Sequence, residues 1–197
     1  MKLNGENIIQ ASRIQVWDAL NDPGVLKETI PGAQSVDQSS DDEFKAVVEI
    51  KIGPVKAKFT CKIKLSDVNP PNGYKIIGQG QGGAAGFAKG SAVVSLTELD
   101  PETTKLVYEV DAQVGGKLAQ VGQRLIQSAS KSLADQFFNN LQEYFNGDSN
   151  DTEDKQPAPE LGGPARNVFF FNSQRKRIIF ALIVFLLSFI YFYNNLL

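Results

Sequence analysis

Two runs of alternating apolar and polar residues, separated by Gly53-Pro54, constrain the fold more than any other feature of the sequence. In residues 43–52 every second side chain is apolar, and the alternation resumes in residues 55–65. A period of two places alternate side chains on opposite faces of a strand, so an antiparallel hairpin with one buried face is expected. The apolar set of its second strand includes three candidate ligand contacts, namely Phe59, Cys61 and Ile63.

Similar patterns predict further strands, about six or seven in all. Residues 106–114 alternate clearly, with Tyr108 and Val110 in the apolar set. The other expected strands are residues 2–9, 74–82 and 89–99, with residues 32–37 as a weaker candidate.

Helical spacing occurs in two segments. Ser12 is a suitable N-cap for a short helix that ends near Asp22-Pro23. Residues 115–145 carry apolar side chains three and four positions apart, which predicts a helix roughly 45 Å long. Its first half would present Leu118, Val121, Leu125 and Ala129 to the sheet. The sequence therefore predicts an α+β domain over residues 1–145.

The segments VWDALNDP (16–23) and IPGAQSV (30–36), with the closing long helix, resemble the START-like (SRPBCC) helix-grip superfamily. More closely, residues 1–145 resemble the CoxG family of carbon monoxide dehydrogenase subunits. The resemblance implies a curved antiparallel sheet wrapped around the C-terminal helix, with an apolar cavity between them. It also implies service to a molybdenum carbon monoxide dehydrogenase or related hydroxylase, through membrane attachment and traffic of an isoprenoid quinone.

A glycine-rich stretch at residues 78–92 contains Gly78, Gly80 and Gly83, which satisfy the GxGxxG pattern of dinucleotide-binding loops. Such loops open a helix whose N-terminus meets the pyrophosphate, whereas a strand-like segment follows here. Nucleotide binding is therefore not expected.

Small residues recur along one face of the two strands that this stretch contributes. Stripes without side-chain volume cannot fill the space between a sheet and a helix. They favour a cavity for an apolar ligand such as a lipid or a quinone, although a helix docked on a flat glycine floor or a loop would explain them too. The residues concerned are Gly78, Gly80, Ala88, Gly90 and Ala92.

Composition argues for binding over catalysis. The 197 residues include no His and one Cys, which removes histidine-based acid-base chemistry, internal disulfides and the usual zinc sites. The inward-facing sets hold no Asp, Glu, Lys or Arg, so neither an enzyme nor a covalently bound cofactor is expected. A START-like cyclase or dehydratase is the alternative, and it would require an ionisable group facing the cavity. The formal net charge of −2 gives no general field for nucleic acid.

A row of lysines occupies the other face of the hairpin. It is either a solvated face or a docking face for anionic headgroups or an acidic partner. In the second case the protein could act purely in membrane recruitment, with an incidental cavity. The row consists of Lys45, Lys51, Lys56, Lys58, Lys62 and Lys64.

The last part of the sequence predicts a membrane anchor. Residues 178–193 are uncharged, and the twenty residues from 178 to 197 would span roughly 30 Å as a helix, the thickness of a hydrocarbon core. Basic residues precede this run and none follows it, which predicts a single-pass cell-membrane protein with a cytoplasmic domain and an outward C-terminus. The anchor comprises residues 174–197, with Arg175, Lys176, Arg177, Ile178 and Tyr193 as its marker residues. Residues 146–173 are expected to be a flexible acidic tether, rich in Pro and Gly, with a short aromatic interfacial segment.

Overall fold

The structure is a computed structural model that describes residues 2–148. In this part of the chain seven strands, three α-helices and two short 3-10 turns follow one another. In order they are β1 (Lys2–Ile9), α1 (Arg13–Ala19), α2 (Pro23–Thr29), β2 (Ala33–Gln38), β3 (Glu43–Ile52), β4 (Val55–Asn69), β5 (Gly73–Gln81), η1 (Gly83–Ala85), β6 (Phe87–Asp100), β7 (Thr103–Gly115), η2 (Gly116–Val121) and α3 (Gln123–Asp148).

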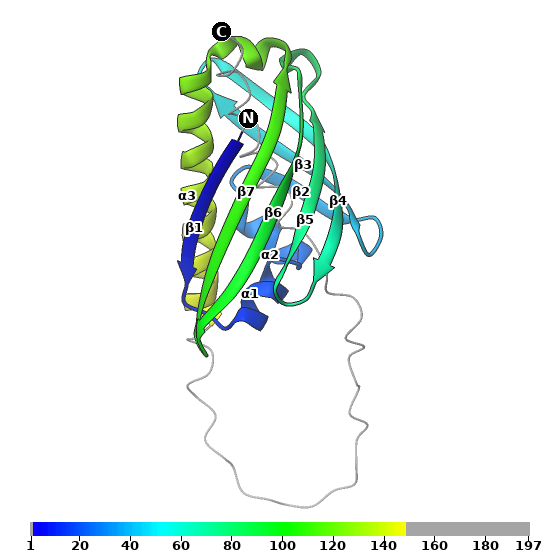
Figure 1. The fold of residues 1–197 in the computed structure, drawn as a ribbon. Coiled ribbons are helices and arrows are strands. Elements are labelled where there is room, and N and C mark those ends of the chain that lie inside the picture. Colours follow the sequence, from blue (N-terminus) through cyan, green and yellow to red (C-terminus); the bar gives the residue numbers. More distant parts are fainter. Residues whose placement is uncertain (1, 149–197) are drawn as a thin grey trace, which may run out of the picture.

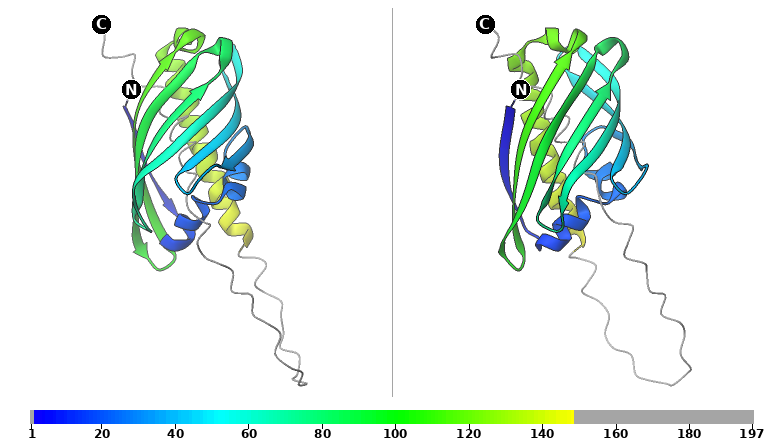
Figure 2. Two further views of the ribbon diagram at one scale, coloured as in Figure 1. Left: turned by 90° about the vertical axis from the view of Figure 1, so that its right-hand side faces the viewer. Right: turned by 45° about the vertical axis from the view of Figure 1, so that its right-hand side comes forward.

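The strands form one antiparallel sheet in the order β1-β7-β6-β5-β4-β3-β2. The sheet curves around α3, and α1 and α2 lie at one end of it (Figure 1). Two further views show α3 along the hollow side of the sheet (Figure 2). This arrangement confirms the expected α+β helix-grip architecture. The end with the β3–β4 turn, η1, η2 and the start of α3 is called the upper end below, and the end with α1 the lower end.

The long helix begins later than residues 115–145 predicted. Gly116 and Gly122 adopt positive φ angles of 81° and 91°, and the 3-10 turn η2 lies between them. At Gly116 a Cβ would lie 2.5 Å from the Cα of Gly86, so no larger residue fits this crossing. The prediction was wrong here because apolar spacing was counted through two glycines that break the helical backbone.

The later start rotates the inward face of α3. Ile126, Ser130 and Ala134 are buried at four-residue intervals, whereas Leu125 is 41% exposed. The predicted face of Leu125 and Ala129 is therefore displaced by one residue toward the C-terminus.

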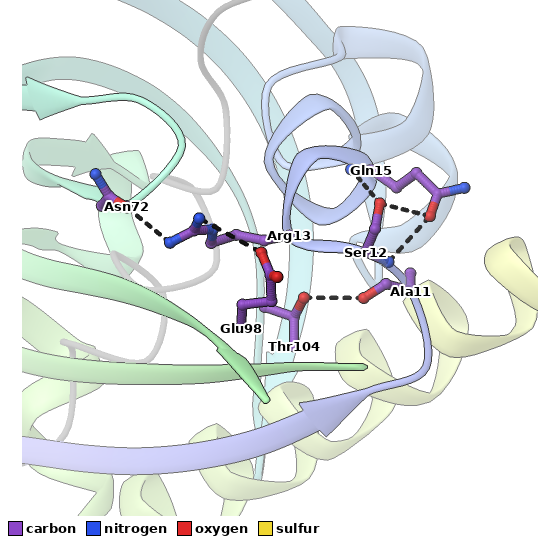
Figure 3. Close-up of polar contacts among 7 residues, drawn as sticks. All are labelled: Ala11, Ser12, Arg13, Gln15, Asn72, Glu98 and Thr104. Carbon is purple, nitrogen blue, oxygen red and sulfur yellow. Dashed lines mark hydrogen bonds and ion pairs between the residues drawn. The ribbon is translucent and has the colours of Figure 1, made fainter. Parts of the chain in front are cut away.

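The lower end is held together by polar contacts around the start of α1 (Figure 3). The Ser12 hydroxyl accepts from the backbone N–H of Gln15, whose side chain in turn accepts from the N–H of Ser12, as in a capping box. The guanidinium of Arg13 donates to Asn72 Oδ1 at 2.9 Å and pairs with Glu98 at 3.4 Å. These contacts confirm the predicted N-cap and join α1 to the β4–β5 turn and to β6.

Within residues 2–148, no helix combines the length and the hydropathy needed to cross a membrane. The predicted anchor at 174–197 and nearly all of the predicted tether at 146–173 lie outside the described residues. Arg175, Lys176, Arg177, Ile178 and Tyr193 are among them.

Candidate ligand-binding site

Aromatic side chains fill the lower half of the space between the sheet and α3. The ring of Trp17 meets Tyr74 edge-on at 5.3 Å between centroids. Phe138 on α3 stacks against Tyr108 of β7 at 5.9 Å and meets Phe137 at 5.0 Å. Rings of this size in mutual contact leave little volume for a ligand.

The upper half of the same sheet face is lined by small residues. Two rows cross strands β4, β5, β6 and β7, and five of their eight members are Gly or Ala. The first row is Ile63, Gly78, Gly90 and Ala112, and the second is Cys61, Gly80, Ala88 and Val114. The predicted stripes of small residues therefore meet as one continuous surface. This surface is mostly backbone, so the space above it is filled either by side chains from other elements or by a ligand.

The first turns of α3 present polar atoms toward the interior. Gln123, Ile126 and Ser130 follow at spacings of three and four, so they share one face of the helix. Ser130 is 1% exposed, and neither its Oγ nor the Nε2 of Gln123 has a hydrogen-bond partner. Unpaired buried polar atoms cost free energy, about 1–3 kcal/mol each. They are the atoms of this helix face to which a polar group of a ligand could bond.

Charged side chains are absent from the buried interior of residues 2–147, where the buried polar residues are Asn21, Thr29, Thr104 and Ser130. The same part of the chain holds no group of three potential metal-ligating side chains. Burial raises the pKa of the Cys61 thiol to about 12, so it is a neutral, unreactive thiol at ordinary pH. The chemistry on offer is thus apolar contact and hydrogen bonding.

Tyr108, a predicted hydrogen-bond donor to a ligand, lies below the rows of small residues. Its ring stacks on Phe138, and its hydroxyl lies against Gly5 of the neighbouring strand β1. Burial raises the pKa of Tyr108, so the hydroxyl is protonated. Val110 is buried one pleat above it.

The other predicted contacts are divided between the interior and the upper rim. Phe59, Cys61, Ile63, Ala88, Ala92 and Leu118 are buried, as are Gly78 and Gly80. The ring of Phe59 fills the space that a side chain would take at Gly82. Gly90, Val121 and Ala129 are half-buried, and Leu125 lies beside the Gly53 turn at the upper end.

Sequence reasoning missed Gln123, Ile126 and Ser130. The signal that would have found them is Gly122, because a glycine directly before an apolar-periodic segment marks a plausible helix boundary. Counting the helical period from residue 123 places all three on the inward face.

A groove of about 850 Å³ lies on the outer face of the sheet, behind the first row of small residues, whose four members also line it. Lys45, Lys62 and Lys89 line it, together with the carboxylates of Glu43 and Asp111. Lys45 lies directly opposite Lys62 in the β3–β4 pairing. Its mixed charges and open shape do not suit an apolar ligand.

Comparison with known structures agrees with this architecture. A conserved protein from Geobacillus kaustophilus shares 35% identity with a TM-score of 0.70, and the match covers 75% of this chain and 96% of that one. A START superfamily protein from Mycobacterium smegmatis has 14% identity and a TM-score of 0.59, with coverages of 74% and 97%. The Zhui aromatase/cyclase of a Streptomyces species also has 14% identity, with a TM-score of 0.56 and coverages of 74% and 93%. The last two show a shared fold.

No curated protein matches the chain. The family profile for the CoxG subunit of carbon monoxide dehydrogenase matches residues 5–146, which include every strand pairing around the small-residue surface. This chain belongs to the CoxG family of carbon monoxide dehydrogenase subunits.

Proposed function

We propose that the chain is an accessory protein that binds one hydrophobic ligand, a lipid or an isoprenoid quinone, between the small-residue surface and the first turns of α3. The observation that carries this proposal is the pair of unpartnered buried polar atoms, Gln123 Nε2 and Ser130 Oγ, on one face of α3 beside an interior that is largely apolar. Apolar pockets with a few polar groups are typical of small-molecule sites. A quinone carbonyl or a lipid ester would accept from either atom.

The protein would deliver or hold this ligand for a carbon monoxide dehydrogenase-type molybdenum enzyme at the membrane. The family name supports this partner, and the apolar run at residues 178–193 supports a single-pass anchor with the domain in the cytoplasm. In this role the protein performs no chemistry itself, consistent with an interior that lacks carboxylates and amines among the described residues.

The test is to purify the full-length chain from native membranes in mild detergent and to analyse its solvent extract by mass spectrometry. The proposal predicts one quinone or acyl lipid, enriched over the bulk membrane lipid and approaching one molecule per chain. An extract with the composition of the detergent-solubilised membrane would contradict it.

Substitutions in the small-residue surface test whether the ligand binds there. Gly80→Leu with Gly90→Leu places two side chains in the proposed ligand volume and should remove the enriched ligand. Ser91→Leu is the matched control, because Ser91 neighbours Gly90 in sequence but faces the outer groove. An equal loss of ligand in the control would count against this location of the site.

A further inference from the structure

The upper end of the domain carries a concentration of positive charge. Three segments meet there, residues 50–60, 79–91 and 112–131, and none of them contains Asp or Glu. Their basic side chains are all exposed. These residues, called the basic tip, are Lys51, Lys56, Lys58, Lys89, Lys117, Arg124 and Lys131.

Close contacts at two glycines hold the three segments together. A Cβ at Gly86, between η1 and β6, would overlap the backbone of Gly115 and Gly116. A Cβ at Gly53, in the β3–β4 turn, would lie 2.5 Å from Cδ2 of Leu125 on α3. The basic tip is therefore a single surface, and Figure 1 shows its loops gathered at one end of the molecule.

The charge of the tip is not neutralised from within. Lys51 lies directly opposite Lys56 in the β3–β4 pairing, an arrangement of like charges that destabilises a sheet. Glu49, just outside the tip, pairs with Lys56 at 2.8 Å and offsets one of the seven charges. At the lower end the region of the β6–β7 turn carries Glu98, Asp100 and Glu102, of which Glu98 pairs with Arg13.

Two large apolar side chains are partly exposed among these charges, with the ring of Phe87 over Gly115 and Leu125 against the Gly53 turn. Phe87 is 39% exposed and Leu125 is 41% exposed, on two of the three segments. Surfaces that insert into the headgroup region combine cationic side chains with exposed large apolar ones. A surface that docks an acidic protein would require the positive charges but not the exposed apolar side chains.

We propose that the basic tip docks on the surface of an anionic bilayer, with Phe87 and Leu125 entering the headgroup region. A lipid surface is favoured because the same chain carries the apolar run at residues 178–193. The 29 residues between 148 and 178 can reach at most roughly 100 Å. That limit exceeds the length of α3, about 39 Å at 1.5 Å per residue over 26 residues, so the chain is long enough for the apolar run and the tip to meet one bilayer. The proposal does not depend on the proposed ligand.

The test uses residues 1–148, so that the apolar run cannot mediate binding. The Geobacillus relative, whose chain is matched over 96% of its length by this region, indicates that the domain folds without the rest of the chain. Co-sedimentation is measured with vesicles of phosphatidylcholine alone and of phosphatidylcholine with about 30% phosphatidylglycerol. Binding is expected only with the anionic vesicles, and it should weaken at least tenfold as salt rises from about 50 to 500 mM.

Two sets of variants locate the surface. Reversing Lys51, Lys58, Lys117 and Arg124 to Glu should lower the bound fraction at least tenfold. The matched control reverses Lys27, Lys45, Lys62 and Lys75, which changes the net charge equally but leaves the tip intact, and it should keep most of the binding. Phe87→Ser with Leu125→Ser should lower binding several-fold without any change of charge.

Circular dichroism and thermal melts establish that each variant is folded before it is compared. The proposal is overturned if the folded wild-type domain does not sediment with anionic vesicles, or if the control set loses as much binding as the tip set. Retention on immobilised polyglutamate, without vesicle binding, would assign the tip to an acidic protein instead.

Discussion

The ring of Tyr108 occupies the space that a side chain would take at Gly5, the residue directly opposite it in the β1–β7 pairing. Cζ of the ring lies 2.5 Å from the position of a Cβ at Gly5. The same ring stacks on Phe138 of α3. The absence of a side chain at Gly5 therefore allows β1, β7 and α3 to pack closely around this ring. This contact closes the aromatic lower half of the interior.

Gly5→Ala should therefore destabilise the domain by about 1–3 kcal/mol, because the new methyl group forces the Tyr108 ring out of its stack. Urea unfolding at neutral pH measures the change. In a Tyr108→Ala background the same substitution should cost much less, since the obstructing ring is gone.

Gly147→Ala is the matched control for this pair. Gly147 lies in the last turn of α3, and apart from its chain neighbours and the helix's own backbone no described atom lies within 4 Å of the position that a Cβ would take. The substitution should be neutral or stabilise by up to about 1 kcal/mol through helix propensity. An equal cost of Gly5→Ala with and without Tyr108 would contradict the proposed contact.

Ser130→Ala should move stability and ligand affinity in opposite directions. Removing an unpartnered buried hydroxyl from a helix interior should stabilise the ligand-free domain by about 1 kcal/mol. It should also weaken ligand binding about tenfold, the value of one hydrogen bond in an apolar site.

Thermal melts of the delipidated protein and a ligand titration measure these two effects. Ser128→Ala, at an exposed position two residues away, should leave affinity unchanged and should stabilise the domain by at most about 0.5 kcal/mol through helix propensity. If Ser130→Ala leaves affinity unchanged, the hydroxyl does not contact the ligand.

Cys61 should make stability fall at alkaline pH. Its pKa is about 12 in the folded protein against an ordinary 9.0, so the native state keeps a proton that the unfolded chain loses. Stability should therefore decrease between pH 9 and 12, by up to about 1.4 kcal/mol per pH unit from this group. The Cys61→Ala variant lacks this dependence, and the difference between the two proteins isolates it from the titration of lysines and tyrosines.

The same burial predicts slow alkylation. At a given pH the thiolate fraction is about a thousandfold lower than for a thiol with the ordinary pKa. Native protein should resist iodoacetamide at about pH 8, whereas urea-unfolded protein should react completely. Rapid modification of the folded protein would show that the thiol is accessible from solvent.

Ser12→Ala should destabilise the domain by about 1 kcal/mol, because the helix loses the cap that accepts from the N–H of Gln15. Ser12→Thr retains a hydroxyl and should recover most of the loss. Chemical denaturation distinguishes the two, and equal stability of the Ala and Thr variants would exclude a capping role.

The sheet could be predicted from sequence because its alternation is a local property. The strands at residues 43–52 and 2–9 have the bounds that the sequence predicts, and in residues 43–52 every second side chain is apolar through the whole strand. The small-residue stripes could also be found, as both of them lie within consecutive strands that pair directly with each other.

The helix side of the site could not be predicted in the same way. Its register depends on Gly122, whose positive φ ends η2 and resets the helical period before Ile126 and Ser130. The filling of the lower half is also a tertiary property, because the stack of Tyr108 on Phe138 joins residues thirty positions apart. Neither feature produces a periodic pattern of apolar residues in the sequence.

The most direct test of a ligand in the upper interior is a calorimetric titration of the delipidated full-length chain with a short-chain quinone and, separately, with a short-chain phospholipid. We expect saturable one-to-one binding of at least one of them, with a negative heat-capacity change from burial of apolar surface. Gly80→Leu with Gly90→Leu should abolish that binding while the domain stays folded. Undiminished binding by the folded double variant, or no binding of either compound by the wild type, would contradict the account.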